Sequence, residues 1–195
     1  IARQRQELLD SSLPGGMMGG YIEENFPFYF VNRHMLEYLG YEDEAEFVTD
    51  IGGYISNCMH PDDRTMVGRS VEEQFEHSDE YVVEYRMRKK DGSYIFVHDV
   101  GRKITAEDGR PAIVSVCIDI TDQKKLQNEL LHLYNNIPGA VFRCRFDEGF
   151  SVIDANDGFF DILGYTREEF AAMGNRMSAV TSPEDLAAMK EYLNG

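Results

Sequence analysis

The residues whose types and spacing best suit chemistry are His60, Asp62 and Asp63, in the run His60-Pro61-Asp62-Asp63. An imidazole and two carboxylates this close together can bind a divalent cation. The same run also has the features of a helix start, because proline suits the first helical position and acidic side chains there complement the helix dipole. The run returns later as Ser182-Pro183-Glu184-Asp185, without the histidine. We therefore expect a helix start at this point and no metal site.

The remaining candidate groups do not indicate catalysis. No glycine-rich phosphate loop follows a strand pattern, and no Ser/His/Asp order has a supporting motif. His132 lacks the acidic or proline context of a phosphoacceptor histidine. The three cysteines, Cys58, Cys117 and Cys144, are odd in number and are not spaced as metal ligands. We expect reduced thiols in a cytoplasmic protein, and a chain that is not itself an enzyme whatever the activity of its parent protein.

The charge of the chain excludes two classes of partner. Its formal net charge is −16, whereas nucleic-acid phosphates and anionic lipid surfaces both demand a basic protein surface. No apolar run approaches the roughly 20 residues that span a bilayer. We therefore expect no nucleic acid and no direct membrane contact. The hydrophobic fraction of 43% is ordinary for a globular protein.

A long internal repeat sets the domain organisation. Leu13-Pro14-Gly15-Gly16 returns as Ile137-Pro138-Gly139-Ala140, a shift of 124 residues (137 − 13), and Leu39-Gly40-Tyr41 returns as Leu163-Gly164-Tyr165 at the same shift. A period this long indicates two tandem copies of a domain rather than a solenoid. The second copy stops roughly halfway through its template, so we expect a piece of a longer protein. Because half a core is missing there, we expect the apolar side chains of that copy to pack on the exposed sheet of the first domain or on another copy of the chain. They are Phe142, Val152, Ile153, Phe159, Phe160, Ile162, Leu163 and Phe170.

Short strands and helices are expected before residue 77. Tyr21–Glu23 and Phe28–Val31 are strand candidates that follow a glycine-rich break. Short helices follow Asn32, and a longer helix over 62–76 has an apolar stripe.

Three strands and a helix are expected after residue 80. Segments 81–89, 94–104 and 112–120 form an antiparallel meander, with Asp-Gly turns between them. The middle strand is apolar on both faces, so each face of the sheet needs a cover. Thr121 is expected to cap a helix over 122–136, whose leucines have heptad spacing.

These patterns in this order resemble a PAS domain. The match rests on Asn32 with Leu39-Gly40-Tyr41, on the helix that opens with His-Pro-Asp-Asp, and on the meander that ends in Asp119-Ile120-Thr121. The resemblance implies an α+β fold with a five-stranded antiparallel sheet flanked by short helices, then a connecting helix and a truncated second PAS copy. The implied domains are residues 1–12 (end of an upstream connecting helix), 13–121 (complete PAS/PAC domain), 122–136 (connecting helix) and 137–195 (N-terminal half of a second domain).

PAS domains of some subfamilies hold cofactors, and the sequence disfavours two of them. Flavin-binding LOV domains have Asn-Cys-Arg-Phe-Leu-Gln, but here Asn57-Cys58 is followed by Met59-His60-Pro61. Haem needs an axial ligand, and the helix over 62–76 has no histidine. The cofactor is left unknown. In this family a ligand lies between the sheet and the short helices, but we expect the residues at these positions to fill the core rather than line an open pocket. The candidates by parity are Met35, Tyr38, Phe47, Val67, Val71, Val83, Tyr85 and Met87.

The resemblance also implies a function in signal transduction. Asp119 and Thr121 would couple the domain to its output helix, unless they serve only to start that helix. We expect a sensory module that relays the state of a small-molecule ligand or a partner to an output such as a diguanylate cyclase or a histidine kinase. The alternative is a dimerisation or interaction scaffold that does not switch. We expect a homodimer, formed through the connecting helix or the sheet face.

Overall fold

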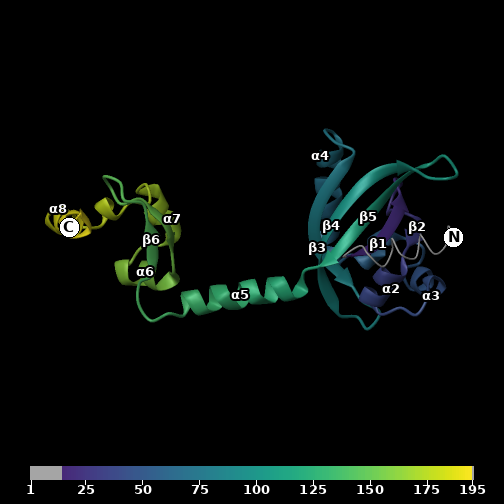
Figure 1. Ribbon diagram of the computed structural model, residues 1–195, viewed down its shortest axis with the longest axis horizontal. Helices are drawn as coiled ribbons and strands as arrows, with labels where there is room; N and C mark the ends of the chain where they lie inside the picture. Colours follow the sequence, from purple (N-terminus) through teal and green to yellow (C-terminus); the bar gives the residue numbers. More distant parts are fainter. Residues whose placement is uncertain (1–14, 195) are drawn as a thin grey trace. The chain divides into compact units, whose positions relative to one another are not determined.

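The computed structural model describes residues 15–194, which divide into two compact units. The first runs to Lys124 and the second starts at Lys125. The boundary lies inside helix α5 (Thr121–Asn135), the segment expected as the connecting helix (Figure 1). Residues 1–12, expected to end an upstream helix, lie outside the described residues. None of the helices in residues 15–194 is long and apolar enough to cross a membrane.

The first unit is built on the expected five-stranded antiparallel sheet. Its strands are β1 (Gly16–Tyr21), β2 (Phe28–Val31), β3 (Glu80–Arg88), β4 (Tyr94–Thr105) and β5 (Pro111–Asp119), in the order β2-β1-β5-β4-β3. The last three strands form the predicted meander. Gly92 and Gly109 supply the positive φ angles of its two turns, as Asp-Gly sequences favour.

The prediction for the first strand was wrong. We expected a glycine-rich break followed by a strand at Tyr21–Glu23, but the glycine-rich segment is itself β1, between β2 and β5. A Cβ on Gly16 would lie 2.8 Å from the Cα of Met35, and one on Gly19 would lie 2.5 Å from the carbonyl oxygen of Ile113. Glycine is used here because helix and neighbouring strand approach the backbone too closely for a side chain.

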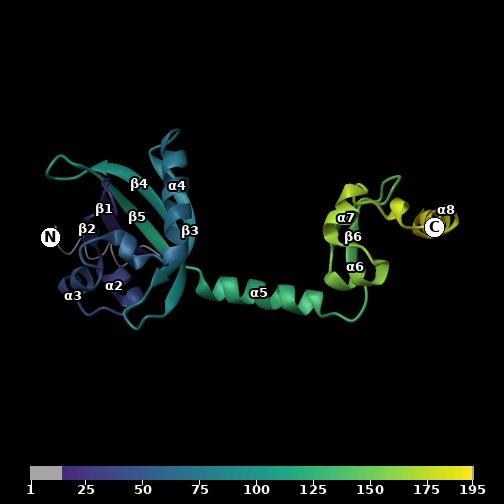
Figure 2. The ribbon, with the colours of Figure 1, turned by 180° about the vertical axis from the view of Figure 1, so that it is seen from behind.

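Short helices cover one side of this sheet (Figure 2). They are α2 (Arg33–Leu39), α3 (Glu44–Asp50) and α4 (Arg64–Phe75), with 3₁₀ turns at Ile55–Cys58 and Pro61–Asp63. The run His60-Pro61-Asp62-Asp63 starts a helix, as expected. The imidazole Nδ1 of His60 accepts from the backbone N–H of Asp62, and the carboxylate of Asp63 pairs with Arg86 at 2.6 Å.

The other face of the sheet carries apolar side chains that are partly exposed. Val82, Tyr94, Phe96 and Val100 are 38–47% exposed among the described residues. They stand on the opposite parity to the buried Val83, Val97 and Asp99, because side chains alternate along a strand.

The second unit repeats the first half of the first. After α5 come β6 (Phe142–Cys144), β7 (Val152–Ala155), α6 (Asp157–Leu163), α7 (Arg167–Ala172), a 3₁₀ turn at Met177–Ala179 and α8 (Pro183–Asn194). Six of the eight apolar residues that we expected to pack on another surface pack against one another around Phe159 and Phe170, while Ile153 and Ile162 are exposed. Contact of this cluster with a further surface stays a prediction.

An asparagine at equivalent positions makes the same pair of hydrogen bonds in both units. The Oδ1 atom of Asn32 caps α2 by accepting from Met35 N–H, and it also accepts from Met17 N–H of β1. Asn156 does the same in the second unit, accepting from the N–H groups of Phe159 and Val141. One asparagine side chain therefore connects a helix start to β1 in the first unit, and to the residue just before β6 in the second.

Candidate functional site

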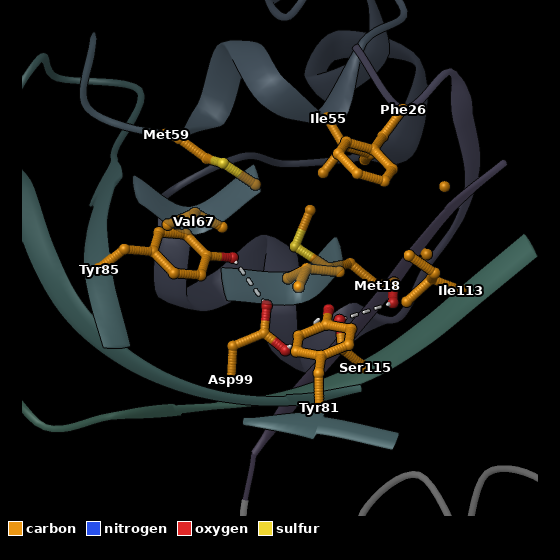
Figure 3. A pocket seen from close by; sticks show the side chains of 13 residues that line it. Met18, Phe26, Ile55, Met59, Val67, Tyr81, Tyr85, Asp99, Ile113 and Ser115 are labelled. Carbon is orange, nitrogen blue, oxygen red and sulfur yellow. Dashed lines mark hydrogen bonds between the residues drawn. The ribbon is translucent and has the colours of Figure 1, made fainter. Parts of the chain in front are cut away.

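A cavity of about 30 Å³ lies between the sheet and the helices of the first unit (Figure 3). This is enough room for ordered water or a small group. Its wall is mainly apolar, and the polar side chains gather on the sheet side. The lining residues are Met18, Gly19, Gly20, Phe26, Ile55, Met59, Val67, Val71, Tyr81, Tyr85, Asp99, Ile113 and Ser115.

Asp99 is the ionisable centre of the polar side. It is 3% exposed, and its two carboxylate oxygens accept from the Tyr85 hydroxyl at 2.9 Å and the Tyr81 hydroxyl at 3.3 Å (Figure 3). Burial raises the pKa of Asp99 to about 6, against the opposing effect of the hydroxyls that donate to it. The Ser115 hydroxyl lies 3.5 Å from the carbonyl oxygen of Met18. No lysine, arginine or histidine lines the cavity among residues 15–194.

The geometry of this group depends on β4 and its neighbours. Val97, Asp99 and Gly101 point inward because they share one parity of the strand. A Cβ on Gly101 would overlap the ring of Tyr81, which stands on the neighbouring strand directly opposite. Because Gly101 has no side chain, the ring of Tyr81 can lie over it, and from this position the Tyr81 hydroxyl donates to Asp99.

The residues predicted to line a pocket are spread over the core. Val67, Val71 and Tyr85 line the cavity. The remaining five are buried or half-buried in the surrounding core but are not among its lining residues: Met35, Tyr38, Phe47, Val83 and Met87.

Sequence reasoning missed the polar members of the site: Asp99, Tyr81 and Ser115. One signal could have found Asp99. Asp99 is two residues after Val97 on the same strand, so the alternation of side chains predicts that this ionisable residue faces the core.

The second part of the site is the junction between the sheet and α5. The carboxylate of Asp119 accepts from the N–H of Thr121 at 2.9 Å. The hydroxyl of Thr121 accepts from the N–H of Phe96 on β4, also at 2.9 Å, so it joins strand to helix instead of capping the helix as we expected. The N–H of Ile120 donates to the carbonyl oxygen of Phe96. The start of α5 is therefore bonded to the backbone of the strand that carries Asp99.

An ion pair on the face of the sheet away from the cavity is a second contact between the sheet and α5. The ammonium of Lys124 in α5 lies 2.6 Å from the carboxylate of Glu84 on β3, and His98 on β4 lies 3.3 Å from the same carboxylate. The hydrogen bond from Lys124 holds the pKa of Glu84 below its ordinary value. Since these groups are about one-third exposed or more, the pair orients the helix more than it stabilises the fold.

The far end of α5 is fixed within the second unit. The side-chain amide of Asn156 donates to the carbonyl oxygen of Tyr134 at 3.2 Å and to that of Gly139 at 3.1 Å. The side-chain oxygen of Asn135 accepts from the N–H of Asp157. Both ends of the helix thus have side-chain-to-backbone ties.

Cys58 does not provide a reactive thiol. It is buried in the 3₁₀ turn Ile55–Cys58, and burial raises the pKa of its thiol to about 12, so it stays protonated near neutral pH. It is not among the residues that line the cavity.

Comparison with known proteins gives two family matches. Residues 28–117 match a model described as "PAS fold", and residues 128–192 match one described as "PAS domain". The uncharacterized protein y4lL of Sinorhizobium fredii (strain NBRC 101917 / NGR234) is 33% identical over 76 residues, which are 38% of this chain and 9% of that protein. The chain thus spans a small part of that relative's length.

Two solved structures are similar to part of this chain, and the second of them has the same fold. A sensory box histidine kinase/response regulator from Burkholderia thailandensis E264 is 28% identical, over 65% of this chain and 92% of that one, with a TM-score of 0.48. The PAS domain of a Colwellia psychrerythraea protein is 20% identical over 63% of this chain and 98% of that one, with a TM-score of 0.50. With a five-stranded antiparallel sheet in the first unit and a family match in each unit, this chain belongs to the PAS family of sensory domains.

Proposed function

We propose that the first unit senses the occupancy of its cavity and relays it through β4 to helix α5. The observation that carries this proposal is the position of two sets of contacts on one strand. Asp99 faces the cavity, and Phe96, three residues earlier, bonds the start of α5 through its backbone N–H and carbonyl groups. His98 lies between them and contacts the carboxylate that holds Lys124.

The mechanism is a shift between two packings of the sheet. An occupant that contacts Asp99, Tyr81 or Tyr85 favours the position of β4 that suits it. Because Phe96 is bonded to Thr121 and Ile120, that shift changes the orientation or stability of the first turn of α5. A ligand moves such an equilibrium only by its differential affinity for the two states.

In this proposal the signal leaves the first unit through helix α5. We infer a signalling protein in which α5 transmits the change to the second unit, whose Asn156 holds the last turn of the helix. A diguanylate cyclase is the output we favour, and a histidine kinase is the alternative. In this proposal the two PAS units provide sensing and relay, and the catalytic step belongs to the output domain.

A non-switching scaffold is the second candidate function. Apolar side chains are exposed both on the sheet face and on α5, where Leu126, Leu130 and Leu133 are 66–70% exposed among the described residues. Heptad spacing of these leucines favours a homodimer through the helix, with the sheet face as the other route. Native mass spectrometry separates the candidates. A dimer that retains a stoichiometric small molecule supports sensing, and a dimer that never binds one supports the scaffold.

The relay is tested by filling the cavity. Val67→Phe on α4 adds bulk inside it, and Met66→Phe adds a similar ring at a neighbouring position that is 50% exposed. Amide hydrogen exchange is measured at Phe96 and over the first turn of α5. The proposal expects altered exchange in the first variant and unchanged exchange in the second.

A change confined to the cavity wall would refute the relay. Should Val67→Phe not fold, as judged by circular dichroism, the smaller Val67→Ile takes its place with the same readout.

A further inference from the structure

The first unit contains a buried carboxyl group with no cationic side chain among the residues that line the cavity beside it. Asp99 is 3% exposed, and the residues that line the cavity in the described part of the chain include no lysine, arginine or histidine. Buried charges in proteins are normally paired, because an unpaired one keeps the full cost of leaving water. The hydroxyls of Tyr81 and Tyr85 provide hydrogen bonds but no charge.

The groups around the carboxylate supply hydrogen bonds but no positive charge. The hydroxyls of Tyr81 and Tyr85 donate to its two oxygens, and Ser115 and Cys117 of β5 also lie beside it. The rest of the wall is formed mainly by apolar side chains such as Met18, Met59, Val67 and Val71. The cavity therefore has one carboxylate, that of Asp99, in a wall that is otherwise mainly apolar.

From this combination we propose that the cavity binds a small alkylammonium ion, with the ammonium on Asp99 and the alkyl group against the methionine and valine side chains. An ammonium donates to the carboxylate in a charge-assisted hydrogen bond, which is stronger than one between neutral groups. An anionic ligand is excluded by repulsion from Asp99. A neutral alcohol can donate the same hydrogen bond but leaves the charge uncompensated.

The size of the cavity limits the ligand. A volume of about 30 Å³ admits a group of a few heavy atoms as the side chains stand. Met18 and Met59 line it on separate segments, and methionine repacks readily because its side chain is unbranched. Short chains such as methylammonium to propylammonium are therefore the appropriate probes.

The inference rests on the proposed sensing function, but it has its own test. Uniformly ¹⁵N-labelled chain is titrated at pH 7.5 with propylammonium, 1-propanol and propionate, and the amide shifts of residues around the cavity are followed. We expect saturable shifts with propylammonium and an affinity about tenfold tighter than for 1-propanol, as charge pairing implies. Propionate should give no shifts at the cavity.

Two variants locate the binding. Asp99→Asn keeps the shape and removes the charge, and should reduce the affinity for propylammonium to that for 1-propanol. Asp161→Asn makes the same change at an exposed position of the second unit and should leave the affinity unchanged. If Asp99→Asn does not fold, the wild type is titrated at pH 5 instead, where Asp99 is largely protonated, and the preference for propylammonium over 1-propanol should disappear.

Each contrary outcome overturns the inference. Equal affinities for propylammonium and 1-propanol would refute the ligand class, as would binding that survives Asp99→Asn. No binding of either would refute the cavity as a site for such ligands. The relay is judged separately: binding of propylammonium without altered exchange in α5 would refute the sensing function and leave the ligand class intact.

Discussion

Replacing Asp99 by asparagine should stabilise the first unit near neutral pH. Burial raises the pKa of this carboxyl from its ordinary 3.8 to about 6, so the folded state holds the ionised form at a cost. At ~1.4 kcal/mol per pKa unit, the difference between 6 and 3.8 corresponds to about 3 kcal/mol. Asparagine is similar in shape and neutral, and it still offers a hydrogen bond to Tyr81 and Tyr85. The expected gain is therefore about 3 kcal/mol in the free energy of unfolding.

The gain should depend on pH in one direction. Between pH 3.8 and about 6 the folded state binds a proton that the unfolded state has released. The stability of the wild type therefore falls as pH rises through this window, and the full cost is present above it. The titratable groups that face Asp99 are Tyr81 and Tyr85 from β3 and Cys117 from β5. Burial raises the pKa of each, so all three stay neutral throughout the window.

The assay is urea unfolding of both proteins, followed by circular dichroism at pH 4 to 8. Taking the difference between Asp99→Asn and wild type cancels the titration of the carboxylates that both share. The difference also removes the contribution of the second unit to unfolding, because the substitution leaves that unit unchanged. We expect a difference that is small near pH 4 and rises to about 3 kcal/mol by pH 7.5. A difference that stays flat across this range, or a variant that is less stable at pH 7.5, would refute the reasoning.

Three further predictions concern other contacts. Asn156→Ala removes four hydrogen bonds from a fully buried side chain and should destabilise the second unit by roughly 2–4 kcal/mol, measured as a lower urea midpoint for that unit alone. Gly101→Ala forces the ring of Tyr81 off its position and should cost about 1–3 kcal/mol, with a changed tyrosine near-ultraviolet circular dichroism signal; an unchanged spectrum would contradict this. Lys124→Ala breaks a partly exposed pair with Glu84 and should change stability by less than about 1 kcal/mol while speeding amide exchange in the first turn of α5, an effect that high salt should reproduce in the wild type.

The local patterns that predicted correctly are those whose geometry is set by nearby residues. The two Asp-Gly turns fix the meander, because glycine supplies positive φ at no steric cost. The helix start at His60-Pro61-Asp62-Asp63 depends on a proline and on acidic side chains within one turn.

The predictions that failed depend on residues far apart in the chain. The segment Gly16–Tyr21 has a poor local preference for a strand, but Met35 and Ile113 come close enough to require glycine there. Thr121 was expected to cap its own helix, yet its hydroxyl bonds the N–H of Phe96, which lies 25 residues earlier. Both results need the sheet to be assembled first.

The sequence by itself determined the family, the tandem order of the two units and the helix between them, because repeats, turns and periodicity are properties of the chain. Only the tertiary structure decided what the site contains. Asp99 becomes distinctive when β3 brings Tyr81 and Tyr85 onto its oxygens and the fold buries it away from bulk solvent. The charge of a carboxylate is a property of its residue type, but its cost and its partners depend on a solvent boundary that exists only after folding.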